Sequence, residues 1–238
     1  CGGRTRSRTS GRSITAATPD GLFVVFEGVE GAGKSTHLEL LGEHLSERGV
    51  PHRIVREPGG TEAGERIRRV VLDAALEVTA RTELLLMLAA RAEFVERLVR
   101  PALRKGEVVL ADRYELSTFA YQGVARELGL DRVRELNAFA TDGLKPDALV
   151  LLEVSPETGR RRKAGDAERD RMESEDEEFH RAVADAYRRL AEEMPGDLTR
   201  SPNGLIRVPA EDERDPVHRR IREELHGRWP ETFGSPAG

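Results

Sequence analysis

The chain has 238 residues, of which 34% are charged, and a formal net charge of −5. This length suits one α/β domain, and the acidic balance gives no general attraction to nucleic acid, so we expect no nucleic-acid partner. Cys1 is the single cysteine, which excludes an intrachain disulfide and favours a reducing, cytoplasmic location. No run of 18 apolar residues is present that would span a membrane.

Composition divides the chain into three predicted segments. Residues 1–20 are rich in Gly, Ser, Thr and Arg, which is typical of a flexible tail or linker, although an Arg-rich, acid-poor start also resembles a transit peptide. Because the chain begins with Cys rather than Met, we expect this segment to have joined a preceding part of a longer protein. Residues 21–228 are expected to form the folded domain, and residues 229–238 a disordered C-terminal end.

The first predicted element is a buried strand at residues 22–26, followed by a glycine-rich turn and a helical pattern through Leu38, Leu41 and Leu45. Further apolar runs then alternate with helical patterns. We predict strands near 53–55, 108–111, 148–152 and 205–208, and helices near 61–72 (with Thr61 as N-cap), 82–103, 114–124, 130–142, 179–190 and 215–226. Such alternation predicts an α/β fold with a five-stranded parallel sheet covered by helices on both faces.

The glycine-rich turn carries the strongest functional signal. Residues 28–35 fit the phosphate-binding pattern G-x-x-x-x-G-K-[ST], and they lie between a predicted strand and a predicted helix. In that setting, backbone N–H groups and the helix N-terminus form a cradle for anions. We therefore predict that Lys34 reaches the β- and γ-phosphates of a nucleotide and that the Ser35 hydroxyl holds Mg²⁺.

Two charged residues follow the strand predicted at 108–111. Ligands of parallel sheets bind beyond the carboxyl ends of the strands, where the loops 28–35 and 112–114 are expected to converge. Asp112 is therefore predicted to hold Mg²⁺ or its waters, with a simple helix cap as the alternative. Arg113 is predicted to face an acceptor phosphate, with a surface ion pair as the alternative.

Residues 160–171 contain six basic side chains between two predicted helices. A run of charges is usually a solvated face. Because this one follows a strand end and Pro156, we favour a short mobile lid that closes arginines over the phosphates and excludes water.

On the long predicted helix, Met87, Arg91 and Phe94 share one face. An arginine among leucines and alanines is costly to bury without a partner. Arg91 is therefore expected to point at a polar ligand, or at an acid such as Glu57 in a structural ion pair.

Taken together, these motifs resemble bacterial thymidylate kinase, a P-loop kinase. The matching blocks occur in the family's order and spacing over residues 22–226, and they are FEGVEGAGKST at 26–36, REPGGT at 56–61, AAR at 89–91, DRYELSTFAYQG at 112–123, PDALVLLEV at 146–154 and DRME at 170–173. The resemblance implies transfer of the ATP γ-phosphoryl group to dTMP, giving dTDP and ADP, with Mg²⁺ as cofactor in an enzyme that is usually a homodimer.

The resemblance also implies roles for individual residues. Arg91 would hold the thymine edge, Arg113 the 5′-phosphate, and Arg162 in the lid would be the catalytic arginine beside Lys34. The ATP-binding residues would be Gly28, Val29, Glu30, Gly31, Ala32, Gly33, Lys34, Ser35 and Thr36. The dTMP-binding residues would be Glu30, Glu57, Pro58, Arg68, Met87, Arg91, Arg113, Thr118, Tyr121 and Gln122.

The chain departs from the family pattern at three places, one of which is Pro209, where the last strand is often followed by Asp on the adenine side. Met87 stands where the family usually has an aromatic residue stacked on thymine, so we expect weaker base discrimination or help from Phe94. The family's second lid arginine falls near Asp166, and Arg169 or Lys163 is expected to replace it. Two other functions are considered: another nucleoside or nucleotide kinase, and a non-catalytic nucleotide-binding module of a larger protein.

Overall fold

A computed structural model describes residues 21–163 and 170–234 of the chain. Within these residues, five parallel strands form one sheet in the order β2-β3-β1-β4-β5. The strands are β1 (Leu22–Glu27), β2 (His52–Arg56), β3 (Val108–Asp112), β4 (Ala148–Glu153) and β5 (Leu205–Pro209). The predicted parallel sheet is therefore confirmed, and β1, which leads into the P-loop motif, is its central strand.

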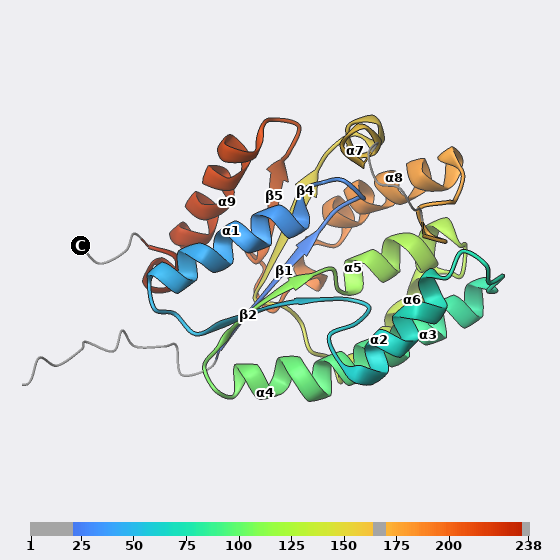
Figure 1. Cartoon of the computed structure of the whole chain (residues 1–238), viewed down its shortest axis with the longest axis horizontal. Helices are drawn as coiled ribbons and strands as arrows, with labels where there is room; N and C mark the ends of the chain where they lie inside the picture. Colours follow the sequence, from blue (N-terminus) through green and yellow to red (C-terminus); the bar gives the residue numbers. More distant parts are fainter. Residues whose placement is uncertain (1–20, 164–169, 235–238) are drawn as a thin grey trace, which may run out of the picture.

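Helices cover both faces of the sheet (Figure 1). Their bounds are α1 Lys34–Glu47, α2 Glu62–Leu72, α3 Ala80–Phe94, α4 Arg100–Leu103, α5 Glu115–Thr118, α6 Leu130–Thr141, α7 Pro156–Lys163, α8 Glu177–Glu193, α9 Arg214–Arg228 and α10 Pro230–Phe233. Two π-helical segments, η1 (Val95–Val99) and η2 (Phe119–Ala125), continue α3 and α5, and a short 3₁₀ turn, η3, spans Pro195–Asp197.

The alternation of side chains along each strand explains this double cover. In β1, Val24 and Phe26 pack with α1 and α9 on one face, whereas Phe23 and Val25 pack on the other face with α3 and its continuation. Successive side chains of a strand point to opposite faces, so a strand that is apolar throughout must be covered twice. All six residues of β1 are buried.

Register places the functional loops at one edge. Phe26 of β1 lies level with Asp112 of β3 and with Val150 of β4. The carboxyl ends of these three strands therefore meet, which brings the P-loop beside Asp112 and Arg113 as expected.

Two details of the helices agree with the predictions. Thr61 is the predicted N-cap of α2, and its hydroxyl accepts a hydrogen bond from the Gly64 N–H at 3.0 Å. The predicted helix over 82–103 is formed by α3, η1 and α4 in succession. No helix of the described residues is long and apolar enough to cross a membrane.

The prediction of a disordered end from residue 229 is wrong for its first part. Residues 230–233 form α10, and Phe233 is buried in the core against α1. Arg48, directly after α1, donates hydrogen bonds to the carbonyl oxygens of Thr232 and Glu231, which holds this end in place. An aromatic residue within a Pro- and Gly-rich end was the signal available in the sequence. Residues 1–20 and 235–238 lie outside the described part of the chain.

Candidate active site

The P-loop connects β1 to α1 and contains glycines at positions where any other residue would have a strained backbone. Gly28 and Gly31 have φ angles of 140° and 71°, in the region that favours glycine. A Cβ atom at Gly31 would lie 2.2 Å from the carbonyl oxygen of Gly159 on α7. The loop therefore has its fixed shape because two backbones approach closely at this point.

Lys34 begins α1 and turns back into this loop. Its Nζ donates hydrogen bonds to the carbonyl oxygens of Gly28 and Val29, at 3.1 and 3.0 Å. Burial and the nearby Arg113 guanidinium lower the pKa of Lys34 to about 8. A phosphate group in the loop would supply the negative charge that this buried ammonium lacks.

Ser35 and Asp112 lie together, as predicted for a metal site. The Ser35 hydroxyl donates a hydrogen bond to Asp112 Oδ2 at 2.9 Å. Asp112 Oδ1 is buried and has no hydrogen-bond partner among the described residues. A hydroxyl and a carboxylate with a free oxygen are the hard ligands that Mg²⁺ prefers, so these residues fit that ion.

Arg113 is held rigidly between the P-loop and the rest of the site. Its Nη1 donates hydrogen bonds to Gly28 O, Ser117 Oγ and Tyr187 Oη, at 3.1–3.2 Å. Its φ of 72° is in the left-handed region, which costs a non-glycine residue about 1–3 kcal/mol. Such strain persists where the surrounding contacts impose it, and it occurs most often at functional sites.

Glu27, which we did not predict, organises the segment that carries Arg113. Its carboxylate accepts hydrogen bonds from the backbone N–H groups of Tyr114 and Ser117 and from the hydroxyls of Ser117 and Tyr187. The sequence signal was a carboxylate that ends a wholly apolar strand directly before the P-loop motif.

Beside Arg113 is a cavity of about 100 Å³, which we call the acceptor cavity. Eight of the ten residues predicted to bind dTMP line it, namely Glu30, Glu57, Pro58, Arg68, Met87, Arg113, Tyr121 and Gln122. Its other lining residues were not predicted, and they are Val71, Leu72, Ser117, Asp170 and Met172. The segment after α7 therefore closes one side of the cavity.

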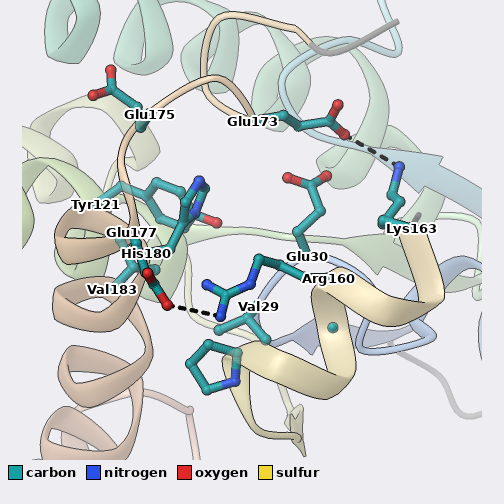
Figure 2. Close-up of a pocket in the computed structure, with 12 residues that line it drawn as sticks. Val29, Glu30, Tyr121, Arg160, Lys163, Glu173, Glu175, Glu177, His180 and Val183 are labelled. Carbon is teal, nitrogen blue, oxygen red and sulfur yellow. Dashed lines mark hydrogen bonds and ion pairs between the residues drawn. The ribbon is translucent and has the colours of Figure 1, made fainter. Parts of the chain in front are cut away.

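A second cavity, of about 510 Å³, adjoins the first through Glu30 and Tyr121, which line both. Figure 2 shows its charged walls, in which Lys163 pairs with Glu173 at 3.2 Å and Arg160 with Glu177 at 3.0 Å. Burial raises the pKa of Glu30; Arg113 opposes this rise and the Glu173 carboxyl group adds to it.

Comparison with known proteins agrees with this geometry. The family model described as thymidylate kinase matches residues 26–221. A thymidylate kinase of Caldanaerobacter subterraneus subsp. tengcongensis is 44% identical over 175 residues, which cover 74% of this chain and 84% of that protein. A thymidylate kinase of Halothermothrix orenii is 41% identical over 210 residues, which cover 87% of this chain and 97% of that protein.

The chain belongs to the thymidylate kinase family. The reaction of this family is the ATP-dependent phosphorylation of dTMP.

Arg91 and Thr118 do not line the acceptor cavity. Arg91 is 1% exposed, and it donates to Glu57 Oε2, Asn137 Oδ1 and Tyr114 O at 2.7–2.8 Å. The ion pair with Glu57 that we expected as one alternative is present, and it places the guanidinium behind the cavity wall. Thr118 is fully buried.

Phe94 cannot help to hold the base, so that expectation is wrong. Its ring is fully buried in the core cluster that contains Phe23 and Val99. The turn of η1 follows it, and the residue faces the sheet and Gly60 rather than the cavity.

Arg162 on α7 lies close to the P-loop but does not reach the acceptor cavity. Its Nη2 donates to the carbonyl oxygens of Ala210 and Asp212, at 2.9 and 3.1 Å, in the loop between β5 and α9. Lys163 pairs with Glu173. Residues 164–169, which include Asp166 and Arg169, lie outside the described residues.

Proposed function

We propose that this member of the thymidylate kinase family transfers the γ-phosphoryl group of ATP to dTMP between the P-loop and the acceptor cavity. One observation carries the assignment of the two sites. Arg113 lines the acceptor cavity and also donates a hydrogen bond to Gly28 O of the P-loop. A fixed cation therefore lies between a donor cradle and an acceptor cavity, where phosphoryl transfer needs charge neutralisation.

The chain's residues would act mainly by position and charge. The dTMP phosphate is already anionic near pH 7, so its oxygen can attack without a strong general base. Lys34 would draw the β- and γ-phosphates into the loop, and Arg113 would hold the acceptor phosphate in line. Arg162 lies near enough to Gly31 O, at 3.5 Å, to belong to the donor side.

Ser35 and Asp112 would hold Mg²⁺, the cofactor expected for this reaction. The metal would neutralise charge on the nucleotide phosphates. The support is the free, buried Asp112 Oδ1 next to the Ser35 hydroxyl.

The thymine base would enter the part of the acceptor cavity lined by Met87, Pro58 and Gln122. Methionine can pack against the face of an aromatic ring, so Met87 would take the place of a stacked aromatic side chain. Gln122 would supply a polar group to the base, and Arg68, another lining residue, donates a hydrogen bond to Pro58 O at 2.9 Å.

The deciding experiment is ATP-dependent ADP release with Mg²⁺, measured against dTMP, dUMP, dCMP, dGMP and thymidine. We expect the highest kcat/KM with dTMP and none with thymidine, because Arg113 needs a phosphate to bind. The Lys34→Ala variant measures the background. A preference for another monophosphate would refute the dTMP assignment, and ATP binding without turnover on any acceptor would favour a regulatory module.

We also propose that the protein is a cytoplasmic homodimer that pairs through α3 and α6. These neighbouring helices expose large apolar side chains, with Leu85 at 59% and Phe139 at 89%. Ala89 and Ala138 are exposed beside them and would let a second copy approach closely. Light scattering should give the mass of two chains, and Phe139→Glu should give that of one. A monomeric wild-type protein at micromolar concentration would contradict the dimer.

A further inference from the structure

Glu83 is a buried acid that the reaction itself does not require. It lies in the first turn of α3 and is completely excluded from solvent. It does not line the acceptor cavity, yet its carboxylate contacts Gln122, which does. A buried charge is costly unless its partners satisfy it, so its retention here needs a reason.

Three side chains donate to this carboxylate. Gln122 Nε2 is 2.8 Å from Oε1, and Arg126 and Arg171 reach Oε2 at 3.2 and 2.7 Å. Burial alone would raise the pKa of Glu83, but these hydrogen bonds outweigh it and lower the pKa. Glu83 is therefore ionised at neutral pH, and an ionised carboxylate can only accept hydrogen bonds.

The ionised carboxylate determines which end of the Gln122 amide faces it. Only the NH₂ group can donate, so Nε2 must face Glu83. The opposite atom, Oε1, is buried and has no hydrogen-bond partner among the described residues. Gln122, which lines the acceptor cavity, therefore carries a hydrogen-bond acceptor of fixed orientation that has no donor among the described residues.

We propose that Glu83 is a specificity-determining residue that fixes Gln122 as an acceptor and so selects bases that carry an N3–H donor. Thymine and uracil have this donor. Cytosine has a lone pair at N3, which would face Oε1 and leave both buried acceptors unsatisfied. This inference rests on the proposed binding of dTMP in the acceptor cavity. It adds that Glu83 determines whether Gln122 accepts a hydrogen bond from the base or donates one to it.

The same carboxylate also holds the wall of the cavity. Arg171 pairs with Glu83 and donates from its backbone N–H to Leu72 O and from Nε to Val71 O. Loss of Glu83 would thus loosen the segment that carries Asp170 and Met172, and raise KM for every acceptor. The preference between acceptors, rather than KM alone, is therefore the informative measurement.

The test is the ratio of kcat/KM for dTMP to that for dCMP in wild type and in Glu83→Gln. A glutamine at this position can donate or accept, so the Gln122 amide is free to rotate. We expect the ratio to fall about tenfold or more, because a rotated Gln122 amide can donate from Nε2 to N3 of cytosine. The cost of placing Oε1 against the N3 lone pair is then removed. The ratio for dTMP to dUMP should stay unchanged, since both bases carry N3–H.

Three control variants distinguish a change in the orientation of the Gln122 amide from general disruption of the cavity. Arg126→Gln removes an ion pair of Glu83 but leaves the bond to Gln122, so the dTMP to dCMP ratio should stay at the wild-type value. Glu83→Asp keeps an acceptor-only group and should also keep the ratio, even with a higher KM. Glu115→Gln alters another buried, ion-paired acid, bound to Lys145 at 2.6 Å, that does not touch Gln122.

The outcomes distinguish this inference from the proposed function. If wild type does not prefer dTMP, the proposed function fails first. If wild type prefers dTMP and Glu83→Gln keeps the wild-type ratio, only the inference is overturned. Should Glu83→Gln not fold, wild type is assayed with N3-methyl-dTMP, which lacks the donor. We expect at least a tenfold loss of kcat/KM, and equal use of this analogue would overturn the inference.

Discussion

Replacement of Gly31 by alanine tests whether the close contact between the P-loop and α7 shapes the donor site. Gly31 has a φ of 71°, and its Cβ would lie 2.2 Å from Gly159 O. Gly49, at the end of α1, has a φ of 68°, with no atom within 4 Å of its Cβ position. An alanine would therefore be strained at both positions, but only at Gly31 would its Cβ also clash with another atom.

The expected magnitudes follow from this difference. A left-handed conformation costs an alanine about 1–2 kcal/mol, so Gly49→Ala should lose about that much stability. In Gly31→Ala, a carbon atom would overlap a carbonyl oxygen that cannot move without α7, and overpacking of this kind adds about 1–3 kcal/mol. For a domain of this size, each kcal/mol lowers the Tm by about 2–4 °C.

The assay compares thermal unfolding and the KM for ATP in both variants. Gly49→Ala should show a small fall in Tm with unchanged kinetics. Gly31→Ala should show a larger fall in Tm, together with a KM for ATP at least about tenfold higher, because displacement of the loop misplaces its N–H groups. Equal effects in the two variants would refute the idea that the contact with Gly159, rather than φ alone, requires glycine.

Three further predictions concern catalysis, the base and pH. Lys34→Ala and Arg113→Ala should each lower turnover at least about a hundredfold in a chain that stays folded by circular dichroism, and near-normal rates would contradict their roles. Met87→Phe should preserve or lower the KM for dTMP, whereas a large rise would place the base elsewhere. Burial lowers the pKa of both His37 and His218 to about 4, so the stability present above pH 6.5 should be lost as the pH falls toward 4. Urea unfolding should show about 1–2 kcal/mol less stability at pH 5 than at pH 7, and a flat profile would mean that these rings are solvated.

Much of the architecture was predictable because its signals are local. Apolar runs such as residues 22–26 must be covered on both faces, and alternating helices supply the cover. The P-loop motif specifies its own geometry, because its glycines adopt φ values that other residues avoid. Asp112 could be placed beside Ser35 because the strands of a parallel sheet end at a common edge.

Other features arise from contacts between residues far apart in the chain. Arg91 satisfies its guanidinium with Glu57 and Asn137, so it lies behind the cavity, and no local pattern distinguishes these partners from a ligand. The carboxylates of Glu27 and Glu83 each collect donors from several elements, which sequence spacing does not reveal.

The sequence by itself determined the strands, most of the helices and the anion cradle, since these depend on periodicity and on the conformational freedom of glycine. Only the tertiary structure decided which polar groups would be buried together. A charged group in the interior is unfavourable unless it is paired, and the packing of the helices and strands determines which residues are close enough to pair with it. That choice places Arg113 in a strained conformation at the P-loop and turns the Nε2 group of Gln122 toward Glu83.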